Sequence, residues 1–177
     1  HFAAGDRRLV VTAAHCPTRT VHELDGLPAA EEFARAHGTT VDLLGPEFFA
    51  THPLVVRVGG GEYVRSIQRK NPDGSLAFFC AIEEGLVLRT ARGRELAEDL
   101  EQTLARLDRS VGGLQTTIAF DCILRRLECE RRGTSADVSA LLERGRCLGF
   151  STYGEQFRGI HVNQTLTGVA IGRRSSV

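Results

Sequence analysis

Residues 149–168, GFSTYGEQFRGIHVNQTLTG, concentrate hydrogen-bonding side chains between two apolar runs. A polar group that is buried without a partner costs roughly 1–3 kcal/mol, so such side chains face water, bond to one another or bind a ligand. A solvated strand face more usually carries Lys and Glu, whereas this stretch carries His, Asn, Tyr and Gln. The stretch therefore indicates a candidate polar binding site, and the polar outer face of an antiparallel sheet is the alternative.

With the two-residue period of a β-strand, this stretch gives two polar strand faces. The face of the last strand carries His161, Asn163, Thr165 and Thr167. The face of the preceding strand carries Ser151 and Tyr153, and Phe150 points to the opposite side. If the two strands pair, their polar faces adjoin and form one surface rich in donors and acceptors.

The types of these side chains suit a small zwitterion such as an amino acid. Its ammonium needs an acceptor, which Asp121 or Glu155 could provide, and its carboxylate needs donors. Arg125 is one such donor, although it could instead belong to a solvated helix face balanced by Glu128. The candidate ligand-binding residues are therefore Asp121, Arg125, Ser151, Tyr153, Glu155, His161 and Asn163.

Catalysis and metal binding are not predicted. Ser151, His161 and Asp121 could in principle act as nucleophile, base and orienting acid, but the second glycine of a G-x-S-x-G turn is missing after Ser151. The five cysteines are odd in number and contain no CxxC pair, which is typical of reduced thiols rather than of disulfides or a zinc site. We expect no enzyme and no metal.

Composition excludes two further classes of partner. The 22 basic and 22 acidic residues cancel, so the chain has no basic excess with which to bind nucleic acid. No window approaches 18 consecutive apolar residues, so we expect no membrane span and a cytoplasmic location. The length of 177 residues suits a single domain over residues 1–177.

The first half of the chain is predicted to be mainly β. Residues 7–14 and 18–24 form a hairpin around Pro17, and residues 28–37 form a helix that Gly38 closes. Residues 40–51 show features of both helix and strand, and no element is predicted there. A meander is then predicted from four runs rich in strand-forming residues: 54–58, 63–69, 76–82 and 86–90.

The second half alternates helices and strands. Leucines at helical spacing predict a helix over residues 94–109, and a second helix starts near Ile123 after a strand over 116–120. Thr134 and Asp137 resemble the capping box of a third helix. The last two strands are residues 148–153 and 160–171, so the predicted fold class is α+β with a largely antiparallel, mixed sheet and packed helices.

Five stretches, in chain order, resemble one known family. They are DGLPAAEEF at 25–33, HPL at 52–54, FDCILRRLE at 120–128, GFSTYGEQ at 149–156 and HVNQTLTGVAIG at 161–172. Together they are similar to the C-terminal domain of the FIST family. The resemblance implies the sensory input module of a cytosolic signal transduction protein, which binds a small molecule, with amino acids suggested as ligands.

The same resemblance implies partners and an optional cofactor. The partners would be an N-terminal FIST domain, which makes this chain a fragment of a longer protein, and a downstream signalling protein. No cofactor is expected, but one subgroup of the family resembles haem-containing nitric oxide sensors, for which His161 and His52 are the axial candidates. A protein-interaction scaffold, as in an F-box adaptor, is the other alternative.

Overall fold

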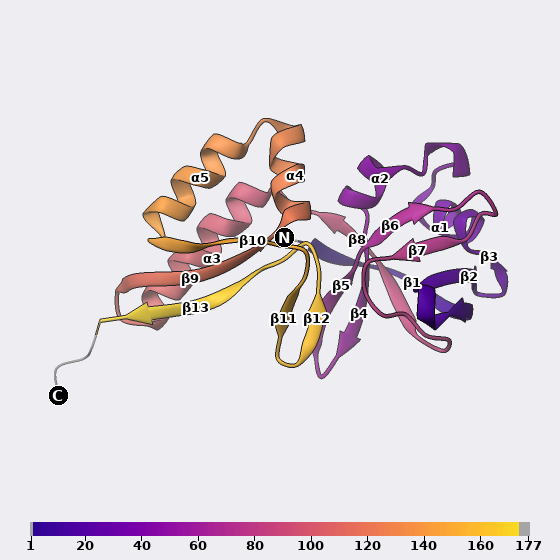
Figure 1. The fold of residues 1–177 in the computed structure, drawn as a ribbon, viewed down its shortest axis with the longest axis horizontal. Helices are drawn as coiled ribbons and strands as arrows, with labels where there is room; N and C mark the ends of the chain where they lie inside the picture. Colours follow the sequence, from indigo (N-terminus) through magenta and orange to yellow (C-terminus); the bar gives the residue numbers. More distant parts are fainter. Residues whose placement is uncertain (1, 174–177) are drawn as a thin grey trace. The chain divides into compact units, whose positions relative to one another are not determined.

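The computed structural model describes residues 2–173, whose contacts divide into two compact units (Figure 1). One unit comprises residues 2–93 and the other begins at Arg94. Both contain strands and helices, so the predicted α+β class is confirmed. Within residues 2–173, no helix has both the length and the apolar character that crossing a membrane requires. A single domain over residues 1–177 stays a prediction.

The first unit is built on an eight-stranded antiparallel sheet in the order β5-β4-β8-β1-β2-β7-β6, with β3 paired to β2. Its strands are β1 (Phe2–His15), β2 (Thr20–Leu24), β3 (Leu27–Pro28), β4 (Leu54–Val58), β5 (Gly61–Arg65), β6 (Ile67–Lys70), β7 (Leu76–Phe78) and β8 (Val87–Gly93). Its helices are α1 (Ala29–His37) and α2 (Pro46–Thr51), with short 3-10 turns at Cys16–Thr18 and Val41–Leu43.

In this unit, the sequence correctly predicted the elements that depend on residues close together in the chain. The β1–β2 hairpin and helix α1 are confirmed, and Gly38 ends α1 in the left-handed conformation with φ 66°. The predicted meander is wrong, because β5 and β6 lie at opposite ends of the sheet. The chain leaves the sheet at buried Ser66, which interrupts the run predicted as one strand over residues 63–69.

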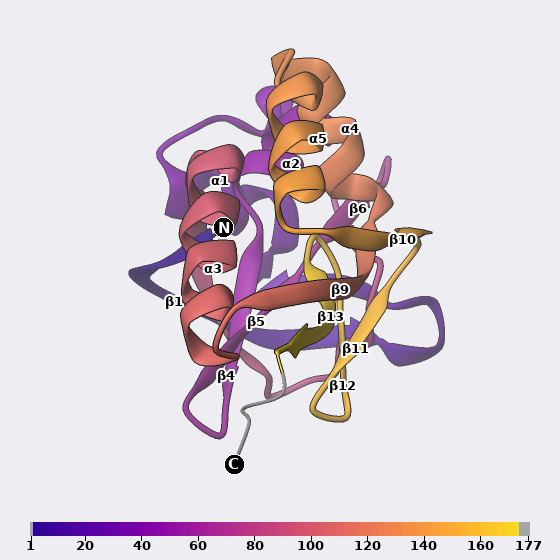
Figure 2. The same ribbon diagram turned by 90° about the vertical axis from the view of Figure 1, so that its left-hand side faces the viewer.

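The second unit is a three-stranded sheet in the order β10-β9-β13, with helices against one of its faces (Figures 1 and 2). Central β9 is parallel to β10 and antiparallel to β13. A separate hairpin, β11–β12, connects β10 to β13. The elements are α3 (Leu96–Ser110), β9 (Leu114–Cys122), α4 (Ile123–Arg132), α5 (Ser135–Arg144), β10 (Cys147–Thr152), β11 (Glu155–Phe157), β12 (Ile160–Val162) and β13 (Leu166–Gly172).

The core of this unit lies between the helices and the sheet. Leu100 and Leu104 of α3 pack with Leu141 of α5, and Cys147 of β10 and Leu166 of β13 pack against them. The register pairs Cys147 with Thr117 and Leu166 with Asp121, so these side chains share the helix-covered face. The predicted leucine stripe of α3 is therefore confirmed as its buried side.

The C-terminal strands differ from the expected arrangement in three ways. The run 160–171 is not one strand, because Gln164 adopts φ 53° and separates β12 from β13. Strand β10 does not pair with the last strand, because β9 lies between them. Phe150 lies on the face opposite to Ser151, as predicted, but that face carries no helix and Phe150 is 66% exposed. Because the strand is broken at Gln164, the alternation of side chains in β13 is independent of that in β12. A prediction of one continuous strand therefore assigns side chains to the wrong faces.

The predicted capping box of α5 is also absent, since Thr134 makes no side-chain capping bond.

Candidate functional site

The candidate positions lie at the two ends of β9. At eight residue steps of about 3.3 Å, these ends are roughly 25 Å apart. The end at Cys122 holds most of the residues predicted from the sequence. The end at Leu114 holds a pocket that the sequence analysis did not anticipate.

Glu155 ties the hairpin to the sheet at the Cys122 end of β9. The residue is 4% exposed, and its carboxylate accepts hydrogen bonds from the hydroxyls of Thr152 and Thr165, the latter at 2.7 Å. Thr152 ends β10 and Thr165 precedes β13, while the backbone N–H of Cys122 donates to the Thr165 carbonyl at 3.0 Å. The Glu155 carboxylate therefore bridges the two outer strands across the end of the central one.

Asn163 is fully buried beside this bridge. Its Nδ2 donates to the carbonyl of Tyr153 at 3.2 Å, but its Oδ1 has no hydrogen-bond partner within the described residues. The ring of His161 lies against Gly154, and a Cβ there would have to displace its Nε2. Asn163 thus holds the turn that follows β10, and its Oδ1 remains a buried acceptor without a partner among residues 2–173.

Asp121 and Arg125 form a pair at the junction of β9 and α4. Nε of Arg125 lies 2.6 Å from Oδ1 of Asp121, and the arginine side chain is 5% exposed. Burial raises the pKa of Asp121, and the charge of Arg125 partly opposes that change. The solvated alternative fits the next residue instead, because Arg126 makes an exposed pair with Glu130 at 2.9 Å.

The seven predicted residues are therefore only partly brought together. Asp121 contacts Arg125, and Asn163 contacts the backbone of Tyr153. The side chains of Ser151 and His161 are exposed, and Tyr153 is 87% exposed. Cys122 is buried, and both burial and the nearby Glu155 carboxylate raise the pKa of its thiol. Ligand binding by these seven residues stays a prediction.

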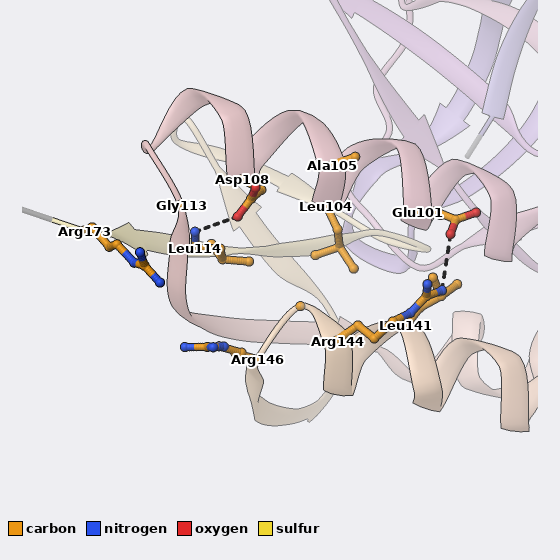
Figure 3. Close-up of a pocket in the computed structure, with 11 residues that line it drawn as sticks. Glu101, Leu104, Ala105, Asp108, Gly113, Leu114, Leu141, Arg144, Arg146 and Arg173 are labelled. Atoms are coloured by element: carbon orange, nitrogen blue, oxygen red, sulfur yellow. Dashed lines mark hydrogen bonds and ion pairs between the residues drawn. The ribbon is translucent and has the colours of Figure 1, made fainter.

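A pocket of about 580 Å³ opens at the Leu114 end of β9 (Figure 3). It lies among the second half of α3, the end of α5, the turn into β10 and the residue after β13. The pocket is lined by Glu101, Leu104, Ala105, Asp108, Gly113, Leu114, Leu141, Arg144, Gly145, Arg146 and Arg173.

The charges of this pocket are unevenly distributed. Arg144 is paired with Glu101 at 3.2 Å, and Oδ1 of Asp108 accepts the N–H of Leu114 at 2.7 Å. Arg146 and Arg173 have no carboxylate partner within residues 2–173. In Figure 3 they lie at one end of the pocket and the Arg144–Glu101 pair lies at the other. The pocket therefore combines a cationic end with an apolar wall.

Backbone contacts hold both of these arginines in place. The carbonyl of Arg146 accepts the N–H of Thr117 at 3.0 Å, and Arg146 itself adopts φ 49° in the turn after α5. The N–H of Arg173 donates to the carbonyl of Gly113 at 3.0 Å. Two residues 27 positions apart in the printed sequence thus meet at the same end of β9.

Sequence reasoning missed this pocket because each of its charges has an ordinary local explanation. Arg144 suits the last turn of a helix, where the dipole favours a cation, and Gly145 suits the turn that follows. Only the order β10-β9-β13 brings the residue before β10 and the residue after β13 to one place. A prediction that β9 pairs with both β10 and β13 would have located the pocket.

The haem alternative fits these residues poorly. Axial ligation requires a histidine or cysteine that faces an apolar slot, but His161 is exposed and the pocket lining contains neither residue type. His52 is stacked on Phe48 at a ring distance of 4.3 Å and lies 5.7 Å from His37, so packed rings occupy its surroundings. Within residues 2–173 no group of three or more His, Cys, Asp or Glu side chains is placed to hold a metal ion.

Comparison with known proteins assigns the family. The sequence model of the FIST C domain matches residues 29–158, most of the chain, from the start of α1 to the hairpin loop after β11. The chain therefore belongs to the FIST C domain family, a sensor-type domain of signal transduction, as the resemblance predicted. No curated protein and no solved structure matches the chain.

Proposed function

We propose that this chain is the ligand-binding sensory domain of a cytosolic signal transduction protein, and that it binds a small molecule such as an amino acid. The observation that carries the proposal is the pocket of about 580 Å³ with two arginines that lack an acidic partner within the part of the chain that the structure describes. Its volume lies within the usual range for small-molecule sites, roughly 300–1,000 Å³. The partners we propose are an N-terminal FIST domain and a downstream signalling protein.

The pocket suits a zwitterion by charge and by shape. Arg146 and Arg173 are placed at one end to donate to a carboxylate, for which a guanidinium offers a bidentate fork. Asp108 uses one oxygen for the Leu114 N–H and keeps further lone pairs for an ammonium. An apolar side chain would then lie against Leu104 and Leu141.

The alternative location is the Cys122 end of β9, with the residues predicted from the sequence. Asn163 Oδ1 is a buried acceptor without a donor, which a ligand could supply. The Glu155 carboxylate, in contrast, is already occupied by two hydroxyl groups. We favour the pocket because the guanidinium groups of Arg146 and Arg173 have no acidic partner among residues 2–173.

Sensing requires a ligand that prefers one of two conformations, because equal affinity for both shifts no population. The pocket meets this requirement in principle, since its walls come from α3, from α5 and from the residues that flank two outer strands. A ligand that bridges Arg146 and Arg173 would favour the arrangement in which these residues are close. That arrangement is what a signalling partner would detect.

A thermal-shift screen against the common amino acids tests the proposal. The wild-type chain should gain stability with at least one of them, by roughly 2.7 kcal/mol at a concentration of 100 Kd. The double variant Arg146→Ala/Arg173→Ala should weaken that binding by about 10- to 100-fold, a loss expected when charge-assisted hydrogen bonds are removed. The control Arg126→Ala removes another exposed arginine, from α4, and should bind as the wild type does.

Three outcomes would redirect the proposal. An unchanged shift in the double variant together with a lost shift in Asn163→Ala would move the site to the other end of β9. Stabilisation by no small molecule but by a protein partner would support the scaffold alternative. A change in the haem Soret band upon addition of the chain, abolished by replacing His52 or His161, would support the haem-sensor alternative.

A further inference from the structure

The face of the three-stranded sheet that carries no helix is apolar. Five large side chains from all three strands point to this face, with exposed fractions of 45–70%. They are Leu148 and Phe150 of β10, Ile118 of β9, and Val169 and Ile171 of β13. We call these five residues the apolar face.

The register shows that the apolar face is one continuous surface. Leu148, Ile118 and Val169 are Cα partners across the three strands, so their side chains form one row. The next row holds Phe150, Phe120 and Thr167, and the rings of Phe150 and Phe120 meet edge to face at 5.4 Å. Neither row contains a charged residue, although a quarter of the whole sequence is charged.

Such a surface is unusual for a sheet in contact with water. Antiparallel and mixed sheets with one free face normally alternate apolar and polar side chains, and the free face is the polar one. From the exposed fractions, the five side chains leave roughly 500 Å² of apolar surface accessible, at the upper end of what monomers show. Surfaces of this kind mark interaction sites.

We propose that the apolar face is a dimerisation surface, on which the same face of a second copy of this chain packs. Two sheets that pack face to face need two apolar surfaces of similar twist, and a second copy supplies both requirements by identity. With Phe120 and the threonines included, the contact approaches the 800 Å² per partner, approximately, of a stable interface. Because neither row carries a charged side chain, nothing in these rows would favour a partner of opposite charge over a second copy.

The geometry also identifies the centre of the dimer. Ile118 lies on the middle strand, between Leu148 on one side and Val169 on the other. In a two-fold arrangement of the sheets, Ile118 therefore lies nearest the axis and faces its own counterpart. An acidic residue at this position would place two like charges together in a desolvated contact.

Sedimentation velocity over a range of concentrations tests the proposal. The wild-type chain should sediment as a dimer that dissociates on dilution, whereas Ile118→Asp should remain monomeric with unchanged far-UV circular dichroism. The matched control is Val58→Asp, because Val58 is 44% exposed in the other unit and Ile118 is 45% exposed. This control should keep the wild-type dimer.

Two further variants keep the test decisive. If Ile118→Asp loses its fold, Leu148→Lys on edge strand β10 carries the same prediction with less disturbance, since Leu148 is 70% exposed. Ile118→Cys should form a disulfide between copies under mild oxidation. A wild-type chain that is monomeric up to its solubility limit overturns the proposal, and so does a dimer that survives both charge substitutions and forms no Ile118→Cys crosslink.

Discussion

Two buried glutamates, one in each unit, are held by different kinds of hydrogen-bond donor. Glu32 of α1 is 1% exposed and accepts hydrogen bonds from Arg7 at 2.8 Å and from Arg35 at 2.7 Å. Glu155 is 4% exposed, and its carboxylate accepts hydrogen bonds from the neutral hydroxyls of Thr152 and Thr165 and from the nearby Cys122 thiol. Glu32 is therefore bound by two cationic side chains, and Glu155 is bound by neutral donors.

The contrast extends to the rest of each unit. In residues 2–93 the histidines, phenylalanines and arginines near α1 and α2 pack or pair with one another. In residues 94–173 two pocket arginines lack an acidic partner, Asn163 Oδ1 lacks a donor, and one face of the sheet lacks a cover. The first unit also holds one buried polar atom without a partner among residues 2–173, Nε2 of His37. The pocket and the uncovered sheet face belong to the second unit, and both of our proposals therefore concern residues 94–173.

The largest expected effect comes from the tight backbone of the second unit. A Cβ at Gly149 of β10 would collide with the carbonyl oxygen of Ala119 in β9. Because that neighbour is backbone and cannot move aside, Gly149→Ala should lower the free energy of unfolding of residues 94–173 by about 3 kcal/mol or more. Urea denaturation with hydrogen-exchange mass spectrometry measures the loss for each unit separately.

Gly45→Ala is the control for this substitution. Gly45 precedes α2 with φ −144°, and nothing lies within 4 Å of a Cβ there. We expect a change of less than about 1 kcal/mol. A loss of protection that spreads equally over both units in Gly149→Ala would contradict the view that the constraint belongs to the second unit.

Replacing the two buried glutamates by glutamine tests the comparison itself. Arginine only donates, so in Glu32→Gln the amide Nε2 faces a donor, and we expect a loss of about 1–2 kcal/mol after allowing for the exposure of both arginines. A threonine hydroxyl can rotate and accept, so Glu155→Gln should cost less than about 1 kcal/mol. Chemical denaturation curves of the two variants decide the order, and the reverse order would refute the distinction drawn between the two sites.

The sequence predicted what depends on neighbouring residues. The leucine spacing of α3, the turn at Pro17 and the Gly38 end of α1 are local features, and each was located correctly. The predicted polar stretch was located too, but its geometry was not, because Gln164 at φ 53° breaks the strand period. The residue types Asn163, Gln164 and Thr165 do not predict a left-handed backbone conformation at Gln164.

The pocket and the apolar face depend on strand order, which a single sequence does not specify. Arg146 and Arg173 become neighbours only because β9 lies between β10 and β13. Phe150 and Leu148 are ordinary core residues by type, and only the placement of all three helices on the other face leaves them exposed. Both features are consequences of long-range pairing rather than of composition.

The smallest expected effect is a difference in acid response between the units. Burial lowers the pKa of His37 and of His52, and hydrogen bonds from Arg35 and Arg7 lower that of Glu32 despite burial. A group whose pKa is lower in the folded state than in the unfolded state stabilises the fold at pH values above its unfolded pKa, which is near 6.5 for histidine. This stabilisation is lost as the pH falls through the folded-state pKa. Burial raises the pKa of Glu128, so its contribution has the opposite sign: it is present below an unfolded pKa of about 4.3 and lost as the pH rises.

Acidification from pH 7 to pH 5 should therefore weaken residues 2–93 first. We expect hydrogen-exchange protection in peptides of that unit to fall by roughly fivefold, which corresponds to about 1 kcal/mol, while peptides from residues 94–173 change less. His37→Phe/His52→Phe keeps the aromatic packing and removes both titrations, so its first unit should respond less to acid. Equal loss of protection in both units of the wild type, or an undiminished response in the double variant, would mean that these histidines do not set the acid sensitivity.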